Sequence, residues 1–296
     1  MQPVHGQSRP TVDVTVVMPA MNREALIGRA LESVAAQTVR PARVLVVDDA
    51  SDDATADVAR AAGAEVLAMD TRSGSGPARN KGVRAATTEW IAFLDSDDEW
   101  LPHHLETVLG HVQGHVLATT AAMSSGGRWK GSPHPGAVAL RPPSMLVPSD
   151  LVVTSATVVS RQAVEDAGFF RPLPRAQDMD LWIRVLETGP GVASSEATVI
   201  YHEHATQAIK DVDLMRQAFE RILDDYAERP WMSTRLRDGA LSRVIWDDLR
   251  EAQAARQWGT VVHKGRWFLN RPHAVGALAR VLHQRHRARR RGRSTP

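Results

Sequence analysis

Three carboxylates lie together at one point of the chain. Asp95, Asp97 and Asp98 fall within four residues and directly follow Trp90–Leu94, an apolar segment typical of a buried strand. Carboxylates this close repel one another unless a cation neutralises them or water solvates them. Mg²⁺ and Mn²⁺ prefer such hard oxygen ligands and share substrate phosphates with one or two carboxylates. Because Ser96, Asp97 and Asp98 could instead cap the next helix, this segment alone leaves both interpretations open.

A second acidic pair, Asp48 and Asp49, follows another short apolar strand, Arg43–Val47. The pair has the same two interpretations, and in isolation helix capping is favoured. A third strand-like segment, Val12–Met18, leads into the turn Pro-Ala-Met-Asn-Arg-Glu. That turn lacks the glycines of a dinucleotide-binding site, and the chain has no P-loop, so the sequence argues against dehydrogenase and P-loop chemistry.

The elements that must position these acids alternate along the first half of the chain. Apolar spacing predicts helices over 23–37, 52–62 and 77–86 in this half of the chain. It also predicts one further strand, over 65–69. Strands separated by helices of this length indicate an α/β fold with a mostly parallel central sheet. Ligands bind beyond the carboxyl ends of such strands, where Pro19–Asn22, Asp48–Asp49 and Asp95–Asp98 should meet.

The second half has a different pattern. Residues 124–148 are rich in Gly, Pro and Ser and predict a long surface loop, a length that is usually functional. Beyond it we expect a helical C-terminal region from about residue 207, with loops near residues 230, 259 and 272. Before that region the periodicity predicts strands over 151–159 and 198–201. It also predicts helices over 162–167 and 178–187.

Composition and charge narrow the class of protein. The 296 residues include no cysteine, which excludes disulfides and thiolate metal sites. No secretory leader or membrane-spanning run is visible, so we expect a cytoplasmic protein. Residues 285–296 hold six arginines and no acid, whereas the rest of the chain carries four more acids than bases. This basic tail is either a solvated terminus or a weak attachment to the inner membrane surface, and nucleic-acid binding has no further support.

Five segments in order resemble family 2 glycosyltransferases, which have the GT-A fold. They are VVMPAMNREALIGRALESVAAQT, VLVVDDASDDAT, GPARNKG, EWIAFLDSDDEWLPHHL and AQDMDLWIR. The resemblance covers roughly residues 12–205. It implies an inverting transfer of a sugar from a nucleotide-sugar, assisted by Mg²⁺ or Mn²⁺. Among nucleotide-sugars, a UDP-sugar is the expected donor. The acceptor, whether glycan, lipid-linked, peptide or small molecule, stays open.

The resemblance also implies a role for individual residues. Asp97 would be the direct metal ligand, with His204 near the metal or diphosphate, and Asp178 would be the catalytic base. The remaining matches would bind the donor: Pro19, Ala20, Asn22, Asp48, Asp49, Arg79, Asn80, Asp95 and Ser96. The sequence departs from the family where Gln177 replaces a glutamate before the base and Arg72 precedes the loop glycine. Asp180 lies about 200° from Asp178 around the predicted helix and is expected to hold the helix or an arginine.

These observations predict four segments: a disordered terminus over 1–11, a GT-A domain over 12–205, a helical region over 206–284 and a disordered basic tail over 285–296. Two other functions remain open. A nucleotidyltransferase on a related scaffold would need a glycine-rich phosphate loop near the N-terminus, which is missing. An inactive nucleotide-sugar-binding module is disfavoured because Asp95, Asp97 and Asp178 are all present.

Overall fold

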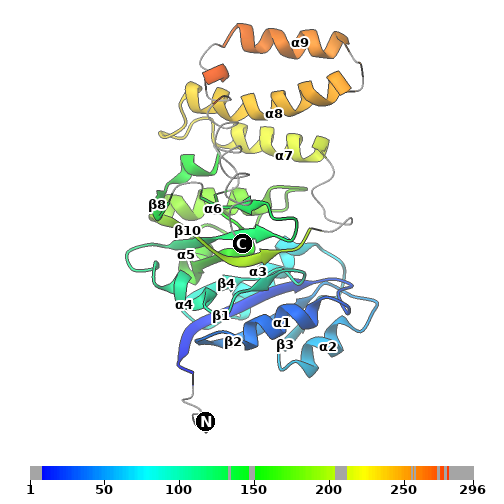
Figure 1. The fold of residues 1–296 in the computed structure, drawn as a ribbon, viewed down its shortest axis with the longest axis vertical. Helices are drawn as coiled ribbons and strands as arrows, with labels where there is room; N and C mark the ends of the chain where they lie inside the picture. The colour runs from blue at the N-terminus through cyan, green and yellow to red at the C-terminus, as the bar shows by residue number, and fades with distance from the viewer. Residues whose placement is uncertain are drawn as a thin grey trace.

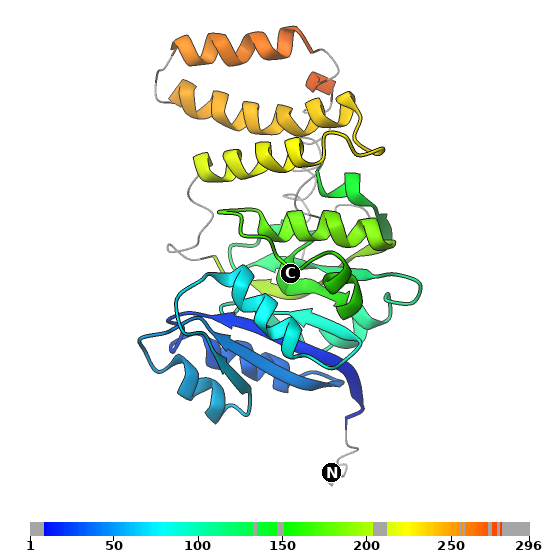
Figure 2. The same cartoon turned by 180° about the vertical axis from the view of Figure 1, so that it is seen from behind.

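A computed structural model describes residues 9–132, 135–146, 151–203, 212–254, 256, 258–271, 274–276 and 279. Figures 1 and 2 show a central sheet with helices on both faces and three further helices stacked at one end. This architecture confirms the expected α/β class with a helical C-terminal region. The predicted basic tail and most of the predicted disordered N-terminus lie outside the described residues.

Ten strands in the described part of the chain form one sheet, in the order β3-β2-β1-β4-β9-β6-β10-β5, with β7 beside β6 and β8 beside β10. Their bounds are β1 Thr11–Ala20, β2 Arg40–Asp48, β3 Glu65–Ala68, β4 Trp90–Phe93, β5 Glu99–Trp100, β6 Leu117–Ser124, β7 Trp129–Lys130, β8 Ala137–Leu140, β9 Thr157–Ser160 and β10 Gly191–Tyr201.

The sheet is parallel where the alternating pattern predicted it. Strands β3, β2, β1 and β4 run parallel, as do β6 and β10. The expectation of a mostly parallel sheet does not hold for the other strands. Strand β9 pairs antiparallel with both β4 and β6, and β5, β7 and β8 also pair antiparallel. The sheet is therefore mixed. Helical crossovers connect the parallel neighbours, including the connection from β6 to β10, which contains α5 and α6.

Helices cover both faces of the sheet. Their bounds are α1 Ile27–Ala35, α2 Thr55–Ala61, α3 Ser75–Ala85, α4 His104–Leu109, α5 Arg161–Asp166, α6 Gln177–Thr188, α7 Val212–Asp225, α8 Thr234–Ala254 and α9 Trp258–Leu269, with 3₁₀ turns η1 Pro142–Met145 and η2 Thr154–Ala156. One core joins α1, α2 and α4 to the sheet, and the other joins α3, α5, α6 and α7 to the opposite face. Alternate residues of β1 separate the cores, with Val16 in the first and Val17 in the second.

Helix α3 lies unusually close to the sheet. A side-chain Cβ at Gly82 would overlap a methyl group of Val17 in β1. The absence of a side chain at this position lets α3 approach β1 directly. This approach matters for function, because Arg79, one turn earlier in α3, faces the end of β4.

Two expectations for the second half need correction. The predicted loop over 124–148 contains β7, β8 and η1, and its Leu140, Met145 and Leu146 are buried. Short antiparallel strands without clear alternation carry little periodic signal, so they read as loop. The break between helices expected near residue 259 falls slightly earlier, between the end of α8 at Ala254 and the start of α9 at Trp258.

Helices α7, α8 and α9 stack beyond α6, away from β1–β3, in both views (Figures 1 and 2). Helix α7 is firmly joined to the main core, since Phe219, Ile222, Leu223 and Tyr226 at its C-terminal end are buried there. Within the described residues, no helix combines the length and apolar character that a membrane crossing requires.

Candidate functional site

The ends of β1 and β2 are joined by side chains that the sequence had assigned to the donor. Pro19 and Ala20 lie within β1 rather than after it, and Ala20 is buried. Asn22 adopts a left-handed backbone conformation (φ 52°), and its side-chain oxygen accepts the N–H of Asp52 at 2.9 Å. The hydroxyl of Ser51 accepts the N–H of Asn22 at 2.9 Å and donates to Asp48. Asn22 therefore holds the loop after β2 against the end of β1.

Asp49 holds the backbone that leads into α3, and not the helix that directly follows it in the sequence. Its two carboxylate oxygens accept the backbone N–H groups of Ser73 at 2.8 Å and Gly74 at 2.7 Å, directly before α3. The residue is 3% exposed. Because both oxygens are engaged, Asp49 fixes the segment that enters α3, whereas Asp48 accepts the hydroxyl of Ser51. Arg72, which departs from the family pattern, pairs with Asp52 at the surface.

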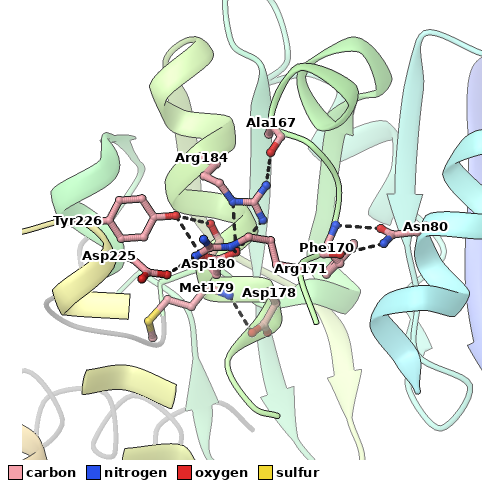
Figure 3. Close-up of polar contacts among 10 residues, drawn as sticks. All are labelled: Asn80, Ala167, Phe170, Arg171, Asp178, Met179, Asp180, Arg184, Asp225 and Tyr226. Atoms are coloured by element: carbon pink, nitrogen blue, oxygen red, sulfur yellow. Dashed lines mark hydrogen bonds and ion pairs between the residues drawn. The ribbon is translucent and has the colours of Figure 1, made fainter. Parts of the chain in front are cut away.

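Helix α3 brings Arg79 to the carboxylate cluster. Arg79 is almost fully buried and forms an ion pair with Asp95, and its guanidinium lies 5.5 Å from the centre of the Phe170 ring. Asn80 has a different partner: its amide donates to the Phe170 carbonyl at 2.9 Å and accepts the Phe170 N–H at 2.8 Å. Figure 3 shows this reciprocal pair. Asn80 thus ties α3 to the segment that leads into α6.

The third acid of the cluster is the most buried. Asp98 is 1% exposed, accepts the Ser155 hydroxyl at 2.5 Å and accepts the backbone N–H of His202 at 3.0 Å. Burial, together with the charges of Asp95 and Asp97, raises the pKa of Asp98 to about 8. Crowding of the three carboxyl groups at this strand end therefore favours the protonated form of Asp98 at neutral pH.

Asp97 lies at the more open side of the cluster. Its carboxylate is 4.0 Å from the Arg23 guanidinium, and its carbonyl accepts Arg29 at 3.3 Å. The capping alternative for this segment is wrong, because β5 intervenes and α4 begins at His104 with no side-chain cap. The carboxylates of Asp95 and Asp97 are instead hard oxygen donors at the carboxyl edge of the sheet, as a divalent cation requires.

No group of three or more His, Cys, Asp or Glu side chains among the described residues could enclose a metal alone. A cation that shares its coordination with a bound diphosphate needs only one or two protein carboxylates, so the donor set here fits Mg²⁺ or Mn²⁺. His204, the other residue predicted near the metal, lies outside the described residues.

Asp178 lies at the first turn of α6 and faces η2. Its Oδ1 accepts the backbone N–H of Met179 at 2.8 Å, and its Oδ2 accepts the Thr154 hydroxyl at 3.1 Å. The side chain is partly exposed. Figure 3 shows Asp180 directed to a different side of α6, among Arg171, Arg184 and Tyr226. The expectation that Asp180 holds arginines is confirmed.

Thr154 and Ser155 are the main residues that sequence reasoning missed at the site. Thr154 holds Asp178, whereas Ser155 donates to Asp98 and accepts the backbone N–H of Asp95 at 3.2 Å. The segment lies within the span of the family resemblance, residues 12–205, but nothing in its composition marks these hydroxyls as contacts. Gln177, beside the proposed base, donates to the Leu173 carbonyl at 2.5 Å.

The Trp residues near the site belong to the core. Trp100 is 3% exposed and donates to the Ser155 carbonyl at 2.6 Å, and Trp182 packs against Phe93 and Phe170. His202, directly after β10, contacts Glu99 at 2.6 Å.

The order of strands, loops and acids matches a known family model. Residues 15–144 match the family described as "Glycosyl transferase family 2". The matched part of the chain is thus identified with glycosyl transferase family 2. The match includes every predicted donor-binding residue and Asp97 but ends before Asp178 and α6.

Curated proteins are similar to parts of this chain. The Pre-mycofactocin glycosyltransferase of Mycobacterium tuberculosis is 31% identical over 215 residues, which are 66% of this chain and 43% of that protein. The Succinoglycan biosynthesis protein ExoO of Rhizobium meliloti is 43% identical over 100 residues, 33% of this chain and 29% of that protein. The chain thus spans less than half the length of these two relatives.

Solved structures share the fold. Staphylococcus aureus TarS 1–349 in complex with UDP-GlcNAc has a TM-score of 0.62 and 19% identity, covering 92% of this chain and 81% of that one. The mannosyltransferase PcManGT of Pyrobaculum calidifontis, in complex with GDP-Man and Mn²⁺, has a TM-score of 0.53 and 19% identity, with 97% and 88% covered. These likenesses support the GT-A fold across both halves of the chain.

Proposed function

We propose that this family 2 protein is an inverting glycosyltransferase that moves a sugar from a nucleoside diphosphate sugar to an acceptor hydroxyl. The observation that carries the proposal is that Thr154 and Ser155, adjacent in η2, hold Asp178 on one side and the Asp95–Asp98 cluster on the other. A donor-binding carboxylate cluster and a separate carboxylate are thereby fixed at one site. A transfer reaction needs both.

The donor would lie along the carboxyl ends of β1, β2 and β4. Asp48 would accept a hydrogen bond from the base, with the backbone of Pro19 and Ala20 beside it. Arg79 and Asp95, as an ion pair, would contact ribose or sugar, with the backbone of Ser96 next to them. In this proposal Asn22, Asp49 and Asn80 act by holding the loops around the donor, because their side-chain atoms are occupied by backbone groups.

Asp97 would hold a divalent cation, with Asp95 beside it. Mg²⁺ or Mn²⁺ bound there would act as a Lewis acid for the charge that develops on the leaving diphosphate. Arg23 and Arg29 add positive charge around Asp97 and Glu99. The Mn²⁺ and GDP-Man in the similar mannosyltransferase structure, and the UDP-GlcNAc in TarS, motivate the choice of metal and donor class.

Asp178 would take the proton of the acceptor hydroxyl. The Thr154 hydroxyl and the Met179 N–H both donate to its carboxylate and fix its orientation beside η2. General-base assistance contributes about 10²–10⁴-fold. One base opposite one leaving group gives a single displacement and inversion at the anomeric carbon.

A donor screen with a chelation control tests the function. Nucleoside diphosphate release would be measured from UDP-sugars and GDP-sugars, with Mn²⁺ and with EDTA, in parallel with thermal shifts by UDP and GDP. A ligand at 100 times its Kd should stabilise the fold by about 2.7 kcal/mol. Pyrophosphate formation from a nucleoside triphosphate would instead identify a nucleotidyltransferase, and binding without turnover an inactive module.

Membrane association through the basic tail is a second part of this proposal. Helix α9 supports it, because Trp258, Val262 and Leu269 are exposed by 61%, 56% and 81%. At 100° per residue these side chains lie within about 40° of one another around the helix. Residues 252–296 contain ten arginines, one lysine and no acid. An apolar stripe beside basic charge fits an anionic lipid surface.

A further inference from the structure

The C-terminal end of α7 contacts the helix that carries Asp178. Asp180, two residues further along α6, is fully buried. Its Oδ1 accepts the Tyr226 hydroxyl at 2.9 Å, and its Oδ2 accepts Arg171 at 2.9 Å and Arg184 at 2.6 Å. Each oxygen of this buried carboxylate is thus engaged, and one of its partners comes from the C-terminal region.

The same end of α7 also holds the segment that leads into α6. Asp225, its last residue, accepts Arg171 at 3.0 Å, and the Arg171 guanidinium lies 6.0 Å from the centre of the Tyr226 ring. Arg171 therefore bridges Asp180 of α6 and Asp225 of α7 (Figure 3). Arg184, one turn along α6, donates to the Ala167 carbonyl and closes the cluster on the other side.

This cluster fixes the rotation of α6 about its axis. Asp178 and Asp180 are separated by about 200° around the helix, so holding Asp180 against α7 directs Asp178 the other way, toward Thr154. Hydrogen bonds from two guanidiniums and one phenol to a buried carboxylate are directional and are not replaced by water.

We propose that Tyr226 and Asp225 are positioning residues for the base: through Arg171 and Asp180 they set the orientation of α6 and hence of Asp178. The inference rests on the proposed function, because it takes Asp178 as the base. It extends the catalytic machinery beyond residues 15–144, to which the family match is confined, and into the helical C-terminal region.

The test compares Tyr226→Phe and Asp225→Asn with Asp224→Asn in the full chain. Tyr226→Phe removes only the hydroxyl that donates to Asp180. Asp224 is the neighbouring acid and pairs with Arg237 at the surface, so Asp224→Asn is the matched control. We expect kcat for transfer to fall about fivefold to twentyfold in the first two variants and to stay within twofold in the control. The Kd for UDP or GDP with Mn²⁺ should stay within twofold in all three.

A double-mutant cycle separates positioning from general structural support. In an Asp178→Asn background, adding Tyr226→Phe should leave the residual turnover unchanged, because the hydroxyl acts through the missing carboxylate. A further fall in that background, a loss of nucleotide binding in Tyr226→Phe, or wild-type kcat in both variants would overturn the inference. If Asp178→Asn itself retains full kcat, the base assignment fails, and that outcome is distinct from failure of the positioning role.

Discussion

Thr154 and Ser155 are consecutive residues that hold opposite parts of the candidate site. The Thr154 hydroxyl donates to Asp178 at 3.1 Å, and the Ser155 hydroxyl donates to Asp98 at 2.5 Å while accepting the Asp95 N–H at 3.2 Å. The dipeptide lies in η2, directly before β9, the strand that pairs antiparallel with β4. Its position therefore sets the spacing between the proposed base and the proposed donor-binding acids.

Substituting the two hydroxyls separately should divide binding from turnover. Thr154→Val keeps the shape of the side chain but removes the donor to Asp178, so we expect a severalfold lower kcat with unchanged nucleotide affinity. Ser155→Ala removes a hydrogen bond to buried Asp98, a loss of about 1–3 kcal/mol, and should weaken Mn²⁺-dependent nucleotide binding. Isothermal titration and steady-state kinetics measure both effects. Identical phenotypes for the two variants would argue against separate roles.

Removing the proposed metal ligand should abolish transfer without unfolding the protein. Asp97 lies at the open side of the acidic cluster, so Asp97→Ala leaves both cores intact. We expect the variant to lose turnover and the Mn²⁺-dependent part of UDP or GDP binding, with a Tm close to that of the wild type. Wild-type turnover in EDTA, or an active Asp97→Ala variant, would contradict the proposal that transfer needs a divalent cation held by Asp97.

The stability contributed by Asp180 should depend on pH in a defined direction. Burial acts to raise the pKa of Asp180, but the hydrogen bonds from Arg171 and Arg184 outweigh it and lower the pKa below 3.8. A carboxyl with a lowered folded-state pKa stabilises the fold above its unfolded pKa and loses that contribution as pH falls through the folded value. Asp180→Asn should cost about 3 kcal/mol of unfolding free energy at pH 7. Urea unfolding should show this difference narrowing below pH 3.8; a difference that is independent of pH would be inconsistent with a charged Asp180.

The apolar stripe of α9 and the basic tail make separable predictions for membrane binding. Deleting residues 285–296 should weaken binding to anionic vesicles and make it less sensitive to salt, while turnover on a dissolved acceptor stays unchanged. Trp258→Ser in α9 should also weaken vesicle binding, because it removes an exposed aromatic side chain from the stripe. Co-sedimentation with anionic and neutral vesicles measures both. Equal binding by all forms to anionic vesicles would rule out this surface.

The first half of the fold could be predicted from sequence because its signals are local. Apolar strands, intervening helices and strand-end acids each occupy a few consecutive residues, and β1 to β4 lie where that pattern indicates. The direction of Asp180 was also predictable, since it follows from helix geometry alone.

The rest of the site depends on contacts between distant residues. Asn80 pairs with Phe170, ninety residues away, and Asp49 accepts the backbone N–H groups of Ser73 and Gly74 before α3. The sequence shows the residue type of an acid or amide, but it does not show whether that side chain contacts a ligand or a remote backbone group. For that reason sequence reasoning grouped these residues with Asp48 and Arg79, and only the folded arrangement separates them.

The central claim is that Asp178 is the base of a sugar transfer, and the kinetics of Asp178→Asn test it most directly. The substitution keeps the shape of the side chain at the partly exposed start of α6, so folding and nucleotide Kd should match the wild type. We predict a fall in kcat of about 10²–10⁴-fold, because the carboxylate acts chiefly in the transition state. Near-wild-type kcat in Asp178→Asn, with a folded but inactive Asp180→Asn, would contradict the account and move the base two residues along the helix.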